Sequence, residues 1–131
     1  MKRQEAFINQ KMMLKGALHC HTTRSDGDGE PDEVIRLHKE NNYDFIALTD
    51  HRIYNYKNFA EDVDITIIPG MEFDNTFVRE NGFRTWHQVY IGPDDETNGY
   101  RQDEKLPRGD AKTQEEFQKY LDEAHEKNNI T

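Results

Sequence analysis

The amino-acid sequence predicts an α/β fold in which parallel strands alternate with helices. Residues 45–49 form an apolar run of strand length, which is typical of a strand buried on both faces of a parallel sheet. Residues 17–21 are expected to form the strand before it. Between the two, Pro31 suits the first position of a helix, acidic residues follow in its first turn, and Asn41 and Asn42 mark its end. A strand, helix and strand in this order predict a right-handed crossover between parallel strands.

Two further strands are expected downstream. Residues 65–68 form a third short apolar run, which leads through a Pro-Gly pair to Glu72. Residues 84–91 predict a fourth strand, because His87 alternates with apolar residues on one face. An inward histidine is often a satisfied core residue, but here other imidazoles and carboxylates are expected on the same side.

A second helix is predicted over residues 113–128. Thr113 and Glu116 have the spacing of a capping box, and the apolar side chains that follow fall on one face. Residues 1–15 are mostly polar and are expected to form a short arm or helix outside the main domain.

Composition limits the classes of partner. The 131 residues suit a single domain, and 33% of them are charged against 34% hydrophobic, so the core is expected to be thin. A net charge of -9 argues against extended contact with duplex nucleic acid or an anionic membrane. One cysteine forms no internal disulfide, and neither a long apolar run nor a signal-peptide pattern occurs. A soluble, cytoplasmic protein is therefore expected.

His19 and His21 predict a metal site at the end of the first strand. Side chains two residues apart lie on the same side of an extended strand, so the two imidazoles can chelate one ion. Asp26 follows in a Ser-Asp-Gly turn, which can fold its carboxylate back toward them. Incidental histidines at a strand end are the simpler alternative for these residues taken alone.

The later strands are expected to bring further donors to the same place. In parallel α/β sheets, the carboxyl ends of the strands share one edge, and functional sites assemble there. His51 follows the second strand and Glu72 follows the third. Asp50 is better placed to support a neighbouring ligand than to bind an ion itself.

These motifs resemble the PHP (polymerase and histidinol phosphatase) family. The resemblance rests on His-Cys-His-Thr with Ser-Asp-Gly, Ala-Leu-Thr-Asp-His at 47–51, Ile-Pro-Gly-Met-Glu at 68–72, and a histidine at position 87. It implies a distorted, seven-stranded (β/α)7 barrel with a di- or trinuclear metal centre at the carboxyl ends of its strands. His19, His21 and Glu72 would hold one ion, and Glu72 would bridge it to a second ion that His87 also holds.

The same resemblance places a third ion on Asp26 and His51. Arg24 would help to hold the phosphoryl oxygens of a small phosphorylated substrate. A mixed set of imidazoles and carboxylates suits Zn, Mn or Fe better than Mg or Ca. The reaction implied is phosphoester hydrolysis by activated water, and hydrolysis of a carbamate or carboxyl ester is the alternative. An amidohydrolase-type enzyme also begins with His-X-His, but no predicted strand end offers the metal-bridging lysine expected of that class.

The resemblance also predicts that residues 1–131 are the N-terminal part of such a barrel. Family members continue with strands that carry His-Pro and Asp-X-His, and the chain ends at Thr131, where the first of these should begin. An open barrel edge is therefore expected, with self-association and incomplete metal binding as consequences. A non-catalytic, metal-binding scaffold is the second alternative for its function.

Overall fold

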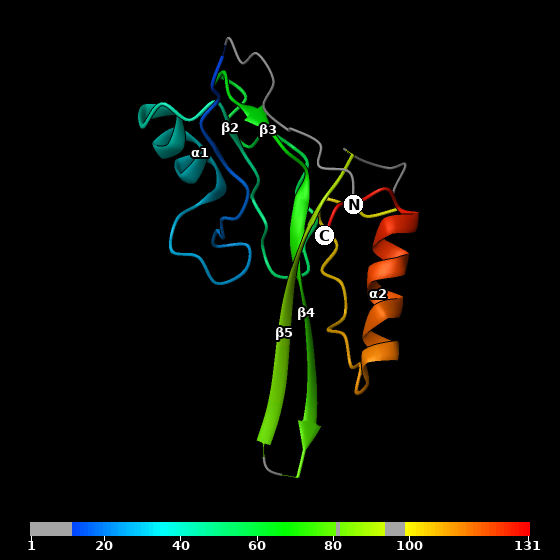
Figure 1. The fold of residues 1–131 in the computed structure, drawn as a ribbon. Helices are drawn as coiled ribbons and strands as arrows, with labels where there is room; N and C mark the ends of the chain where they lie inside the picture. Colours follow the sequence, from blue (N-terminus) through cyan, green and yellow to red (C-terminus); the bar gives the residue numbers. More distant parts are fainter. Residues whose placement is uncertain (1–11, 81, 94–98) are drawn as a thin grey trace.

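A small parallel sheet forms one end of the protein. The computed structural model describes residues 12–80, 82–93 and 99–131, and most of the expected N-terminal arm lies outside them. The sheet has the order β1 (Gly16–Ala17), β2 (Phe45–Ile46) and β3 (Thr66–Ile67), and neighbouring strands are parallel (Figure 1). The second and third strands lie within their predicted ranges, but β1 shares only Ala17 with the predicted range 17–21, so His19 and His21 follow the strand. Each strand is only two residues long. Single hydrogen bonds, such as Thr49 N to Cys20 O at 2.7 Å, continue the pairing toward the site.

Helix α1 (Pro31–Glu40) connects β1 to β2, as the sequence predicts. Its N-terminus has a capping box between Glu30 and Glu33, and Asn41 caps its C-terminus. The side chain of Ile35 is fully buried against the small sheet. Ile35 belongs to the first of two hydrophobic clusters, whose buried members are Ile35, Ile46, Leu48, Ala60 and Ile65.

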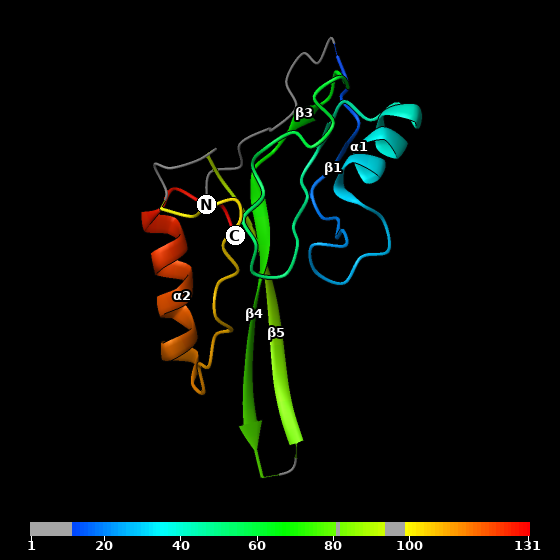
Figure 2. The ribbon, with the colours of Figure 1, turned by 180° about the vertical axis from the view of Figure 1, so that it is seen from behind.

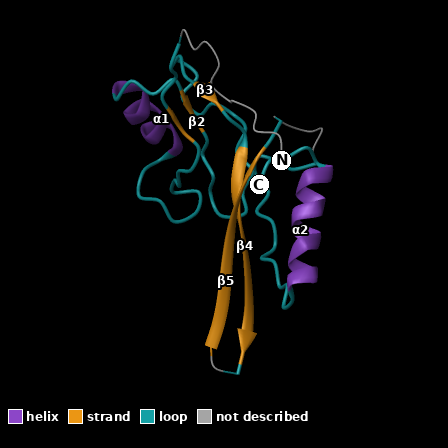
Figure 3. Cartoon of the chain, viewed as in Figure 1, coloured by secondary structure: helices purple, strands orange, loops and turns teal. Residues whose placement is uncertain are grey.

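A long antiparallel hairpin is the main departure from the prediction. Strands β4 (Gly70–Arg79) and β5 (Gly82–Ile91) pair along their whole length and extend away from the small sheet (Figure 3). The fourth predicted strand is confirmed as β5, but the sequence assigned no strand to residues 70–79. The reason is compositional: Asp74 and Asn75 are residue types that are depleted in strands, and they obscure the alternation of Met71, Phe73 and Phe77.

Helix α2 (Gln114–Glu126) packs beside the hairpin and confirms the second predicted helix. Thr113 Oγ1 accepts a hydrogen bond from Glu116 N at 3.2 Å, so the capping box is formed. The ring of Tyr120 lies 5.1 Å from that of Phe73, and the ring of Phe117 lies 4.8 Å from that of Trp86. A second buried cluster, distinct from the first, lies here and contains Tyr54, Met71, Phe73, Tyr90, Tyr100 and Ala124. The two helices lie on opposite sides of the hairpin (Figure 2).

The described residues form a mixed α/β fold with two small sheets, and they do not form a closed barrel. Among them, the outer edge of β5 pairs only through an isolated bridge between Ile91 and Ile130. Self-association through this edge stays a prediction, which light scattering tests. Neither described helix is long and apolar enough to cross a membrane.

Candidate metal centre

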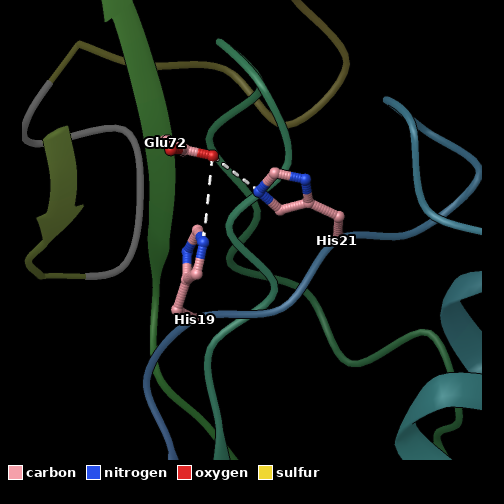
Figure 4. Close-up of side chains that lie close together, drawn as sticks. All are labelled: His19, His21 and Glu72. Atoms are coloured by element: carbon pink, nitrogen blue, oxygen red, sulfur yellow. Dashed lines mark ion pairs between the residues drawn. The ribbon is translucent and has the colours of Figure 1, made fainter. Parts of the chain in front are cut away.

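Glu72 lies at the centre of a group of four imidazoles. Its side chain is 7% exposed, and Oε2 lies 2.7 Å from His21 Nε2, 3.5 Å from His51 Nδ1 and 3.9 Å from His19 Nε2. Oε1 lies 2.7 Å from His87 Nδ1. Figure 4 shows the rings of His19 and His21 directed at the Glu72 carboxylate from the segment after β1.

The local structure explains this convergence. The parallel pairing of β1 and β2 places the segments with His19, His21 and His51 beside each other. A parallel bridge between His51 and Glu72 then joins the second of these segments to β4. His87 is brought in by the antiparallel register, in which it pairs with Asp74 on the face that also carries Glu72. Pairing with β4, the strand that was not predicted from the sequence, therefore positions the His87 imidazole.

Asp26 extends the group on the other side of His21. Its Oδ1 lies 2.6 Å from His21 Nδ1, and its Oδ2 lies 3.4 Å from His51 Nε2. The hydrogen bond from His21 and the nearby imidazoles hold the pKa of the Asp26 carboxyl below its ordinary value. The exposed carboxylate is therefore favoured in its ionised form, which is the form that binds a cation.

Three groups of donor atoms result, and within each group the atoms lie within 4.8 Å of one another. All six sequence-predicted ligands belong to these groups. As neutral rings, His21 and His51 each have one bare nitrogen, so each can serve only one of its two groups at a time. The groups are His19, His21 and Glu72; His21, Asp26 and His51; and His51, Glu72 and His87.

Hydrogen bonds orient two of the rings for metal binding. His19 Nδ1 lies 2.8 Å from Thr49 Oγ1, and His21 Nδ1 lies 2.6 Å from the Asp26 carboxylate. If each Nδ1 donates its proton, each Nε2 carries a bare lone pair on the side of Glu72. This role of Thr49 was not predicted from the sequence, although its place two residues before His51 in the Thr-Asp-His motif is a signal that could have indicated it.

The fit of these residues to a cation is supported by unsatisfied polar atoms. His21 Nε2 and His51 Nδ1 are buried and have no hydrogen-bond partner, even though both lie close to Glu72 Oε2. Buried polar atoms are normally hydrogen-bonded, so exceptions need an explanation. Nitrogen and oxygen atoms that all face a shared ion would provide one.

Asp50 lies behind the donors and makes the supporting contacts that its position in the sequence predicts. Its fully buried carboxylate accepts hydrogen bonds from Thr22 N and Ser25 Oγ, both at 2.7 Å. It also accepts from Thr22 Oγ1 and Asn55 Nδ2, both at 2.9 Å. These bonds hold the turn that carries Asp26.

Arg24 lies outside the donor groups. Its guanidinium donates to Gln102 O and Asp103 Oδ1, and it lies 5.1 Å from the centroid of the Phe59 ring. Among the described residues, no hydrogen bond or ion pair joins its side chain to the six predicted ligands. Its role in substrate binding stays a prediction, and it requires the guanidinium to leave these partners.

The fold and the site together define an α/β domain whose clustered imidazoles and carboxylates are compatible with metal binding. The model of one protein family, the PHP domain, matches residues 17–129. The chain belongs to this family, whose members are generally metal-dependent hydrolases and include phosphoesterases. A comparison with curated proteins found no match.

Proposed function

We propose that this protein is a phosphoesterase that uses two to three divalent ions, Zn, Mn or Fe, to activate water. The observation that supports this most directly is the convergence of four imidazoles on the Glu72 carboxylate. Divalent ions bound there would lower the pKa of a water molecule to about 7 and polarise a phosphoryl group.

The residues have distinct parts in this proposal. Glu72 presents one oxygen to His21 and the other to His87, which suits a carboxylate that bridges two ions. Thr49 and Asp50 keep the ligand segments in place. Arg24 is proposed to hold phosphoryl oxygens, since its guanidinium can bind two of them at once.

The test is turnover of an aryl phosphate by the chelated protein before and after Zn, Mn or Fe is added back. Turnover that returns with metal supports the proposal. Turnover of aryl carbamates or carboxyl esters in place of phosphates would favour the alternative reaction. Stoichiometric metal binding without turnover of any of these substrates would indicate a non-catalytic scaffold.

Replacement of Asp26 by alanine is expected to remove one ion and to leave the ion of His19 and His21 bound. The reason is that Asp26 belongs only to the group with His21 and His51. His51→Ala should behave in the same way if its Nε2 serves that group. Anomalous scattering from crystals of each variant locates the remaining ions.

The control is Asp28→Ala, which removes a nearby carboxylate that belongs to none of the three donor groups. It should keep every ion. Loss of all ions from Asp26→Ala would show a single cooperative site in place of separate subsites.

A further inference from the structure

A buried carboxylate between two arginines lies next to the donor groups. Asp74 is 2% exposed, and its Oδ1 lies 2.8 Å from Arg52 Nε and 3.6 Å from His51 Nδ1. Its Oδ2 forms an ion pair with Arg108 Nε. Asp74 lies two residues after Glu72 on the same face of β4 and is opposite His87 in the strand register. Asp74 therefore lies between the two arginines and the predicted metal ligand His51.

Arg52 is held in an unusual backbone conformation. Its φ is 62°, in the left-handed region that residues with a side chain rarely adopt and that is often found at functional sites. Arg52 N donates to Glu72 O at 2.8 Å, and Leu106 N donates to Arg52 O at 2.8 Å. The side chain is anchored too, since Nη1 donates to Leu106 O at 3.3 Å. The guanidinium is thus fixed beside the site.

Arg108 reaches Asp74 from the segment after Leu106. Its side chain is 54% exposed, and it also lines a cavity of about 210 Å³ between the hairpin and α2. Within the described part of the chain, its terminal nitrogens have no hydrogen-bond partner. The ion pair with Asp74 involves only Nε, so the outer nitrogens of the guanidinium are available to a ligand.

The charge of this cluster has the sign that an anionic substrate needs. Two guanidinium groups and one carboxylate carry a net charge of one positive, in a chain whose net charge is -9. Attraction of an anion must therefore be local. Guanidinium groups bind tetrahedral oxyanions through paired N–H donors, and nearby charged donors strengthen that binding.

We propose that Arg52 and Arg108, fixed by Asp74, form a clamp that binds the oxyanion group of the substrate and of the phosphate product. This inference rests on the proposed function for the identity of the substrate. Binding of the oxyanion itself depends only on the two guanidinium groups and the adjacent donor groups. Asp74 is a positioning residue, because it acts through the arginines.

The experiment measures binding of inorganic phosphate to the metal-loaded protein by isothermal titration calorimetry. Arg108→Gln is expected to weaken phosphate binding about tenfold or more, since it removes a charged hydrogen-bond donor pair. Metal content, measured by mass spectrometry, should be unchanged. Arg108→Lys keeps the charge without the planar fork and should give an intermediate affinity.

The matched control is Arg84→Gln, which makes the same change at an exposed position of β5. Arg84 pairs with Phe77 in the hairpin and belongs to none of the donor groups. It should leave phosphate affinity unchanged. Equal affinity in Arg108→Gln and the wild type, or no binding of phosphate by the wild type, would overturn the clamp. Phosphate affinity of Arg52→Gln is a second test of the clamp. If the Arg52→Gln protein does not fold, the phosphate affinity of Arg108→Gln alone decides between the outcomes.

The two proposals fail in different ways. If no phosphate ester is turned over but Arg108→Gln still weakens phosphate binding, the phosphoesterase proposal is wrong and the clamp stands. If esters are hydrolysed but Arg108→Gln binds phosphate like the wild type, the proposed function stands and the clamp is wrong.

Discussion

Replacement of Glu72 by glutamine is expected to release more than one metal ion from each chain. The carboxylate lies within 3.9 Å of a nitrogen of His19, His21, His51 and His87, so one side chain serves more than one donor group. Glutamine has nearly the same shape but only one acceptor oxygen and no charge. The dissociation constant of the remaining metal should rise by more than about 100-fold, because changes to residues outside the ligand shell already cost 10- to 100-fold.

Metal per chain, measured by mass spectrometry after dialysis, tests this result. The control is Glu61→Gln, which makes the same chemical change at an exposed residue outside the donor groups. Circular dichroism of both variants separates loss of metal from loss of fold. A Glu72→Gln protein that keeps all its metal would show that the carboxylate bridges nothing.

Asp50→Asn is expected to destabilise the protein more than any surface change. The carboxylate accepts four hydrogen bonds, and its side chain is fully buried. In asparagine, an NH2 group replaces one of the two carboxylate oxygens. The donors that bonded to that oxygen then face another donor and lose their acceptor. Each buried donor without a partner costs about 1–3 kcal/mol, so a loss of about 3 kcal/mol or more in the free energy of unfolding is expected.

Urea denaturation monitored by circular dichroism measures this loss. Asp62→Asn is the matched control: the Asp62 carboxylate pairs with Arg36 on the surface, where solvent screens the ion pair, and its unfolding midpoint should hardly move. Similar midpoints for Asp50→Asn and the control would mean that water satisfies the donors and that the network around Asp50 is not structural.

The sequence predicted the donors better than the framework that holds them. His19, His21 and His51 could be placed because short parallel strands bring their ends together, which is a general property of α/β sheets. His87 was predicted on an inward face, but the strand opposite it was missed, since a window with Asp74 and Asn75 resembles a loop by composition. The sequence pattern therefore predicted the clustered donor residues, but it did not predict the antiparallel register that positions His87.

Contacts between distant segments could not be predicted in the same way. Gln102 Oε1 accepts from Tyr56 N at 2.8 Å, and Arg108 reaches Asp74 from more than thirty residues away. Such pairs depend on the path of an irregular segment, for which a single sequence offers no periodic signal. The hydrogen bond between Thr49 and His19 and the ion pair between Arg108 and Asp74 became apparent only in three dimensions.

The separation of the two hydrophobic clusters has a consequence for how the protein unfolds. One cluster joins α1 to the small sheet, and the other joins the hairpin to α2. The predicted ligands come from both parts of the protein: His19 and His21 follow β1 of the small sheet, whereas Glu72 and His87 belong to the hairpin. Bound ions would tie the two halves together and make their melting cooperative.

Trp86 is the one tryptophan of the chain, and its ring packs against Phe77 and Phe117 in the hairpin half. Its fluorescence reports on that half, whereas circular dichroism averages both. The two signals should change together in metal-loaded protein and separate after chelation, because two-state unfolding requires coincident transitions. Removal of bound ions would then let each half follow its own melting curve.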